Sequence, residues 1–165
     1  RCIVAQQGEE LLLIDQHGAH ERVLYERLLY GPAEPPAALE PPEVVLLAGG
    51  LEEEVWRFEE ELAAAGFRLE PFGKDAVRVL AAPRGLGEVA SGLLGALEAL
   101  AGGEDYLRAL ACRGADRFGE ELDRGRMARL LEDWASTRFP EICPHGRPIV
   151  RRIGLEELLR GFGRA

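Results

Sequence analysis

Acidic and histidine side chains gather near the start of the chain, in the stretch Asp15-Gln16-His17-Gly18-Ala19-His20-Glu21. Four apolar residues precede it and a run with helical spacing follows, so we expect a strand that ends at Asp15 and a helix that begins near His17. In such a helix His17 and Glu21 lie one turn apart on one face, with side-chain roots about 5–6 Å apart. This spacing suits two ligands of one metal ion, and Asp15 can reach the same point. A mixed nitrogen and oxygen set accepts zinc, manganese or iron.

The same stretch has a simpler interpretation. Asp15 would cap the helix, and the histidines would lie on the surface. Polar residues are common at helix N-termini, so this stretch taken alone favours the simpler interpretation.

Two further places carry cysteine. Cys143 and His145 stand two residues apart in the loop Cys-Pro-His-Gly-Arg-Pro, and both are ligand types for zinc. Pro144 and Pro148 stiffen this loop. Arg147 in this loop can neutralise a phosphate or pair with a carboxylate. Cys112 lies on an apolar helical face, where a small core thiol is the simpler interpretation. Taken together, the candidate ligands suit metal-assisted hydrolysis of a phosphodiester: Asp15, His17, Glu21, Cys112, Cys143 and His145.

The elements that must position these residues follow an α+β pattern. We expect strands at 2–6, 11–15, 44–48, 67–71, 76–81 and 149–153, and helices at 17–30, 50–65, 86–100, 104–118, 120–136 and 155–162. Residues 31–43 form a proline-rich connector. The predicted fold is α+β with two lobes. One lobe is built from both chain ends, 1–35 and 104–165, and an α/β lobe at 42–103 is inserted into it.

Composition and charge limit the function. The net charge of −9 argues against a freestanding nucleic-acid binder. The charge is uneven, because residues 51–107 carry twelve acids against five bases, whereas residues 138–165 carry six arginines against three glutamates. Three cysteines without a secretory signal predict reduced thiols and a cytoplasmic location. No stretch approaches the roughly 20 apolar residues that span a bilayer. The chain begins almost inside a strand, which suggests a piece of a longer protein.

Three motifs resemble the endonuclease motifs of the MutL family of mismatch-repair proteins. The stretch DQHGAHERVLYE resembles the first, with Asp15, His17, Glu21 and Glu26 at its motif positions. The stretch ACRGA, with Cys112 and Arg113, resembles the second, and CPHGRP matches the third in full. The motifs stand in family order and the lobe layout agrees, so the resemblance covers essentially the whole chain as a C-terminal domain.

The resemblance implies a homodimer with a dimerisation lobe and an inserted regulatory lobe. It implies nicking of double-stranded DNA with manganese or magnesium, with a regulatory or structural zinc ion at the same cluster. The catalytic residues would be Asp15, His17 and Glu21, and the metal site would add Cys112, Cys143 and His145. Supporting positions would be Glu26, Arg113 and Arg147. The ATP-binding N-terminal domain of the family is absent from this chain.

The resemblance also implies partners. MutS and the sliding clamp are expected, and the family's clamp motif, Gln-x-x-Leu/Ile-x-Pro, matches at Leu39 and Pro41 but has Pro36 in place of glutamine. The missing glutamine side chain predicts weak clamp binding. An apolar strand at 11–14 and the terminal helix with Leu155, Leu158, Leu159 and Phe162 are candidates for core or dimer surface.

Mechanism follows as a hypothesis. Metal held by these residues would polarise a phosphate and activate water, with Asp15 as ligand or general base. Arg147, Arg151 and Arg152 would stabilise phosphate charge. The alternative is a non-catalytic, zinc-stabilised dimerisation and interaction module. A zinc hydrolase of small substrates is weaker, because no His-Glu-x-x-His pattern is present.

Overall fold

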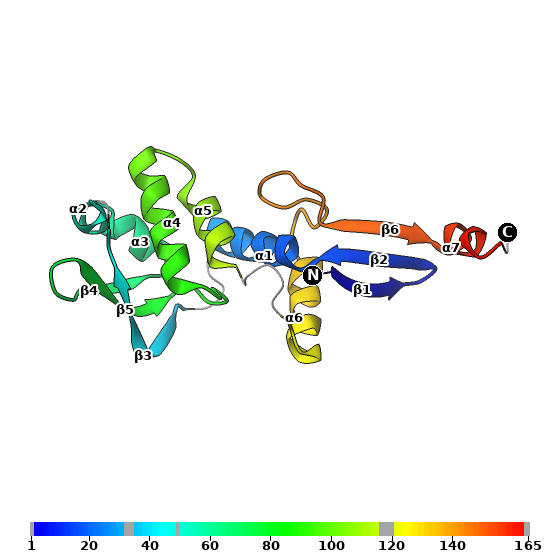
Figure 1. The fold of residues 1–165 in the computed structure, drawn as a ribbon, viewed down its shortest axis with the longest axis horizontal. Coiled ribbons are helices and arrows are strands. Elements are labelled where there is room, and N and C mark those ends of the chain that lie inside the picture. The colour runs from blue at the N-terminus through cyan, green and yellow to red at the C-terminus, as the bar shows by residue number, and fades with distance from the viewer. Residues whose placement is uncertain (1, 32–34, 49, 116–120, 164–165) are drawn as a thin grey trace. The chain divides into compact units, whose positions relative to one another are not determined.

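The computed structural model describes residues 2–31, 35–48, 50–115 and 121–163. It is a mixed α/β structure, and its described part contains seven helices and two three-stranded antiparallel sheets (Figure 1). The chain divides into two compact units, residues 1–23 with 117–165 and residues 24–116. The dimerisation and regulatory roles given to two lobes above stay predictions.

The sheet of the first unit consists of β1 (Cys2–Gln7), β2 (Glu10–Asp15) and β6 (Val150–Gly154). The strand order is β1-β2-β6, which confirms the predicted hairpin and the central position of the apolar second strand. The hairpin turns at Gly8, whose φ of 58° is a conformation that glycine adopts without strain. The order of the strands places β6, which follows the candidate loop, directly beside the strand that leads to Asp15.

Three helices accompany this sheet. α1 (Gln16–Tyr30) follows β2 without a loop, α6 (Arg124–Ala135) precedes the candidate loop, and α7 (Leu155–Gly161) follows β6. One face of the sheet is buried against α1 and α6. The core of this unit is made by residues of the strands, of the helices and of the segment between α6 and β6, namely Ile3, Leu12, Ile14, Ala19, Val23, Leu130, Trp134, Cys143 and Ile149.

The second unit has its own sheet and core. The sheet consists of β3 (Ala37–Leu46), β4 (Arg68–Pro71) and β5 (Ala76–Ala82) in the order β3-β5-β4. Its helices are α2 (Leu51–Arg57), α3 (Glu59–Ala65), α4 (Val89–Gly102) and α5 (Tyr106–Gly114). Buried residues from both strands and helices form the core, among them Val45, Val55, Leu62, Val77, Val79, Leu93 and Leu97.

Two expected elements differ from the structure. The strand expected at 44–48 begins at Ala37, because β3 is an edge strand whose pairing with β5 is irregular between Ala38 and Glu43, and such a stretch accepts Pro41 and Pro42. Residues 32–34 of the expected connector lie outside the described residues. The helix expected at 50–65 is two helices, because the backbone at Phe58 leaves the helical region (φ −107°, ψ 26°).

The helices expected at 86–100, 104–118, 120–136 and 155–162 are present as α4, α5, α6 and α7 with shifted ends, and residues 116–120 lie outside the described part. Within the described ranges, no helix is long and apolar enough to cross a membrane.

Candidate metal centre

Three potential ligands meet in the first unit. Glu21 lies in the second turn of α1, and Cys143 and His145 lie in the loop that joins α6 to β6. Their ligand atoms all lie within 4.8 Å of one another. Glu21 is 6% exposed and Cys143 is 3% exposed, whereas His145 is exposed. Glutamate is rarely buried to this degree unless it is paired, so the burial of Glu21 indicates specific partners at this place.

Glu21 is the centre of this group. One carboxylate oxygen, Oε1, lies 3.3 Å from Nε2 of His17, and the other, Oε2, lies 3.8 Å from Nδ1 of His145. The contact between His17 and Glu21 is the i, i+4 contact that the sequence predicts. A carboxylate that is buried in this way is stabilised by cationic or hydrogen-bonding partners on both oxygens.

The segment Phe139–Pro148, here called the ligand loop, is held in shape by hydrogen bonds within it. The N–H of Cys143 donates to the carbonyl of Arg147 at 2.8 Å, and the N–H of Gly146 donates to the carbonyl of Cys143 at 2.8 Å. Gly146 has a φ of 79°, so this tight turn needs a glycine. A β-bridge between Ile142 and Pro148 closes the base of the turn. These contacts keep Cys143 and His145 at a fixed separation.

Asp15 is the N-cap of α1. Its Oδ1 accepts a hydrogen bond from the N–H of His17 at 3.2 Å, as the simpler interpretation of this stretch predicts. Its Oδ2 lies 3.1 Å from the position that a Cβ would take at Gly18, so the glycine gives the carboxylate room. The group of three ligands above does not include Asp15. A role for Asp15 as ligand or base therefore stays a prediction.

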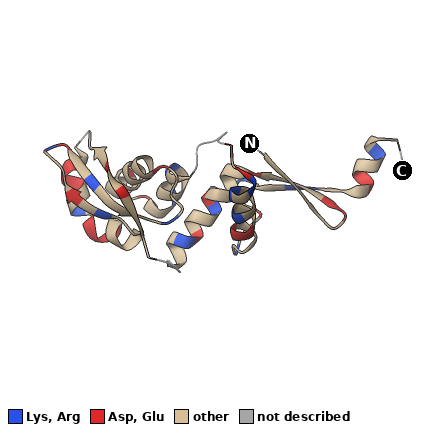
Figure 2. Ribbon diagram, turned by 90° about the horizontal axis from the view of Figure 1, so that it is seen from below, with Lys and Arg blue, Asp and Glu red and all other residues tan. Residues whose placement is uncertain are grey.

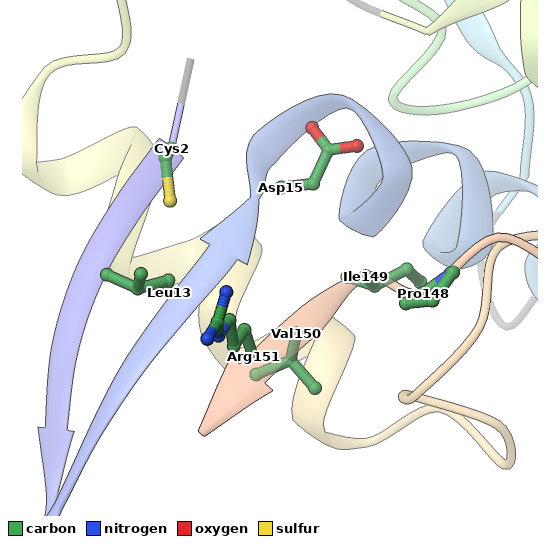
Figure 3. A pocket seen from close by; sticks show the side chains of 7 residues that line it. All are labelled: Cys2, Leu13, Asp15, Pro148, Ile149, Val150 and Arg151. Carbon is green, nitrogen blue, oxygen red and sulfur yellow. The ribbon is translucent and has the colours of Figure 1, made fainter. Parts of the chain in front are cut away.

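An open pocket lies beside Asp15 on the sheet (Figure 3). It has a volume of about 560 Å³ and is lined mainly by apolar groups. Arg151 lies at this pocket, whereas its neighbour Arg152 is held by Glu141 at 3.0 Å and Glu10 at 3.4 Å. The hydrogen bond to Glu141 raises the pKa of Arg152 above its usual value. Arg151 and Arg152, which are predicted to have the same role, thus have different surroundings. The residues that line the pocket are Cys2, Leu13, Asp15 and Pro148–Arg151.

The group of three ligands does not include the remaining predicted residues. Cys112 is half-buried on α5 in the second unit, where its neighbour Arg113 forms an ion pair with Glu98 at 2.6 Å. Glu26 is buried in the part of α1 that belongs to the second unit. The side chain of Arg147 is exposed. Their predicted roles stay predictions.

The donor set suits zinc. Thiolate sulfur, imidazole nitrogen and carboxylate oxygen are the three ligand types that zinc binds in proteins, and three such ligands leave one position of a tetrahedron open. The buried Cys143 favours a soft or borderline ion at this place, whereas manganese and magnesium prefer oxygen ligands. The residues therefore fit a bound transition metal ion.

Sequence reasoning missed one residue of this region, Arg22. It is 6% exposed, and its Nε donates to the carbonyl of Ile142 at 2.7 Å. The available signal was an arginine on the helical face that also carries Ala19 and Val23, which are both buried. A charged residue at helical spacing among core residues indicates a specific buried partner.

Comparisons with known proteins identify the class. Residues 1–118 match the family model of the MutL C terminal dimerisation domain. Among curated relatives, the DNA mismatch repair protein MutL of Thermus thermophilus is 41% identical over 98% of the chain. The same-named proteins of Methanothrix thermoacetophila and Sinorhizobium fredii are 35% identical over 98% and 37% identical over 99% of the chain. The chain therefore belongs to the MutL C-terminal dimerisation domain family. It covers about 30% of the length of these relatives.

Proposed function

We propose that this chain is a metal-dependent DNA-nicking endonuclease domain that acts in mismatch repair and forms a homodimer. The observation that carries the proposal is the meeting of Glu21, Cys143 and His145, whose ligand atoms lie within 4.8 Å of one another. The relatives to which this chain is similar are named DNA mismatch repair proteins. Both facts agree with the family motifs in the sequence.

Glu21, Cys143 and His145 would hold zinc, joined by His17, which contacts Glu21. When bound, a divalent ion, with manganese or magnesium as the nicking cofactor, would supply the charge that polarises a phosphate and activates water. Asp15 would orient or deprotonate the attacking water from the helix N-terminus. Of the three arginines predicted to stabilise phosphate charge, Arg147 and Arg151 remain the candidates, because Arg152 is engaged by Glu141 and Glu10.

DNA binding by this chain alone is expected to be weak. The second unit carries three glutamates in the first turn of α2 and three in the first turn of α3, which give the red helical segments at the left of Figure 2. This charge repels a phosphate backbone. Delivery of the strand would fall to the ATP-binding N-terminal domain, MutS and the sliding clamp.

A homodimer surface is proposed on the first unit. Val4 on β1 is 63% exposed, and Phe162 after α7 is 77% exposed. Leu155 and Leu159 on α7 are exposed too. Val4 pairs with Leu13, which pairs with Arg151, so these side chains share the face of the sheet that points away from the core. Exposed apolar groups on a sheet and a terminal helix fit association with a second copy.

One observation favours a second candidate function. The buried thiol of Cys143 is typical of structural zinc sites. A non-catalytic module, stabilised by zinc and used for dimerisation and protein interactions, would use the same three ligands.

Nicking of supercoiled plasmid in manganese tests the proposal. We expect the native chain to convert supercoiled to open-circular DNA and Asp15→Asn to be inactive, because asparagine keeps the cap but loses the charge. Asp105→Asn is the matched control, since Asp105 caps α5 by accepting from the N–H of Arg108 at 3.1 Å. Full activity of Asp15→Asn would refute the assignment of the site. Inactivity of all three proteins, with zinc still bound, would favour the second candidate.

A further inference from the structure

Three side chains of the first unit contact consecutive residues near the start of the ligand loop. Trp134 on α6 donates from Nε1 to the carbonyl of Pro140 at 2.7 Å. Arg22 on α1 donates from Nε to the carbonyl of Ile142 at 2.7 Å. Arg152 on β6 contacts the carboxylate of Glu141 at 3.0 Å. Three consecutive residues of the loop are thus held by three different elements.

Arg22 is unlike the other two attachments. It directly follows Glu21 in α1, and Ile142 directly precedes Cys143. The hydrogen bond between Arg22 and Ile142 therefore links the helical turn that carries Glu21 to the loop residue that precedes Cys143. Its guanidinium carbon also lies 5.9 Å from the centre of the Phe139 ring, at the start of the ligand loop.

The burial of Arg22 gives this link its strength. Removing a guanidinium from water is costly unless hydrogen bonds replace those of water, so a buried arginine that has such a partner is held in place. Hydrogen bonds from charged donors are about twice as strong as those between neutral groups. A guanidinium has five N–H donors and no acceptor, so Arg22 donates hydrogen bonds and cannot itself be a metal ligand.

We propose that Arg22 is a positioning residue of the metal centre, which fixes the ligand loop on α1 so that Cys143 and His145 stand at Glu21. The inference rests on the proposed function, because it assumes that these three residues bind a metal ion. Arg152 holds the same loop from an exposed position, with 40% of its side chain accessible, where an ion pair contributes little. Arg152 therefore offers a matched comparison.

Titration with Co²⁺ tests the inference, because cobalt bound by a thiolate has a charge-transfer absorption that reports on Cys143. The variants are Arg22→Met, which keeps the stem without the donors, Arg22→Lys and Arg152→Met. We expect Arg22→Met to lower the affinity about 10- to 100-fold and to weaken the thiolate absorption, as loss of a supporting partner does in other metal sites. Arg22→Lys should recover part of the affinity, and Arg152→Met should change it by less than about threefold.

Circular dichroism of the metal-free variants separates positioning from folding. If Arg22→Met does not fold, Arg22→Lys decides: lower affinity with a native spectrum supports the inference, and native affinity overturns it. Native affinity in both Arg22 variants, or an equal loss in Arg152→Met, also overturns it. Failure of the native chain to bind Co²⁺ overturns the metal centre itself, and the inference with it.

Discussion

Asp15 shows at the scale of one residue how capping and chemistry can be separated. Its Oδ1 accepts a hydrogen bond from the N–H of His17, and asparagine can accept the same bond. We predict that Asp15→Ala lowers the free energy of unfolding by about 1 kcal/mol, whereas Asp15→Asn lowers it by less than half of that. Urea denaturation measures both. Equal losses in the two variants would contradict the capping role.

How far single residues can be predicted depends on the range of their contacts. The contact of His17 with Glu21 follows from helical spacing, because both residues lie on one helix. Residue chemistry and the family motifs suggested that Cys143 and His145 approach Glu21. The spacing of these distant segments in the sequence does not require that approach. The bond from Arg22 to Ile142 could not be predicted, because a sequence does not say which remote carbonyl a buried arginine meets.

At the scale of elements, β3 bears on the predicted clamp motif. Leu39 is half-buried and packs against the core of the second unit, and Pro41 is exposed on the same strand. A leucine used in a core is less available to a partner's pocket, and weak clamp binding stays a prediction. The degenerate motif therefore has a structural role in this chain.

We predict that Leu39→Ala lowers the free energy of unfolding by about 1 kcal/mol, roughly half the effect of removing a fully buried leucine side chain. Leu46→Ala on the same strand is the control, because Leu46 is 75% exposed and its loss should change stability by less than about 0.5 kcal/mol. Chemical denaturation compares them. A larger effect at Leu46 than at Leu39 would contradict the packing of β3.

Elements were predictable where the local pattern was strong. The hairpin of β1 and β2 and the start of α1 follow from apolar runs, a glycine turn and a capping aspartate. The break at Phe58 has neither glycine nor proline to signal it, and the helical spacing continues across it. The prolines of β3 led to a predicted strand that was too short, because only the sheet order shows that this strand lies at an edge, where proline is accepted.

At the scale of the whole molecule, the proposed homodimer depends on the exposed apolar face of the first unit. We predict that Val4→Glu, which places a charge on this face, weakens dimerisation at least about tenfold, because a buried unpaired charge costs more than the roughly 1.4 kcal/mol that a tenfold change represents. Sedimentation equilibrium measures the dissociation constant. Leu46→Glu in the second unit is the control, and a loss of dimer there with none at Val4 would contradict the proposed surface.

The distribution of charge and the division into two units also belong to this scale. The acidic helices α2 and α3 lie in the second unit, and the candidate ligands Glu21, Cys143 and His145 lie in the first. The net charge of −9 and its uneven distribution can be read from the sequence. The extent of each unit could not be read from the sequence, because it depends on which helices pack on which sheet.

The most direct test of the metal centre is a crystal of this chain grown with zinc and measured at the zinc absorption edge. We predict an anomalous difference peak about 2.3 Å from the sulfur of Cys143 and about 2 Å from a carboxylate oxygen of Glu21 and a ring nitrogen of His145. A zinc peak at other residues only, with none at these three in saturating zinc, would contradict the account.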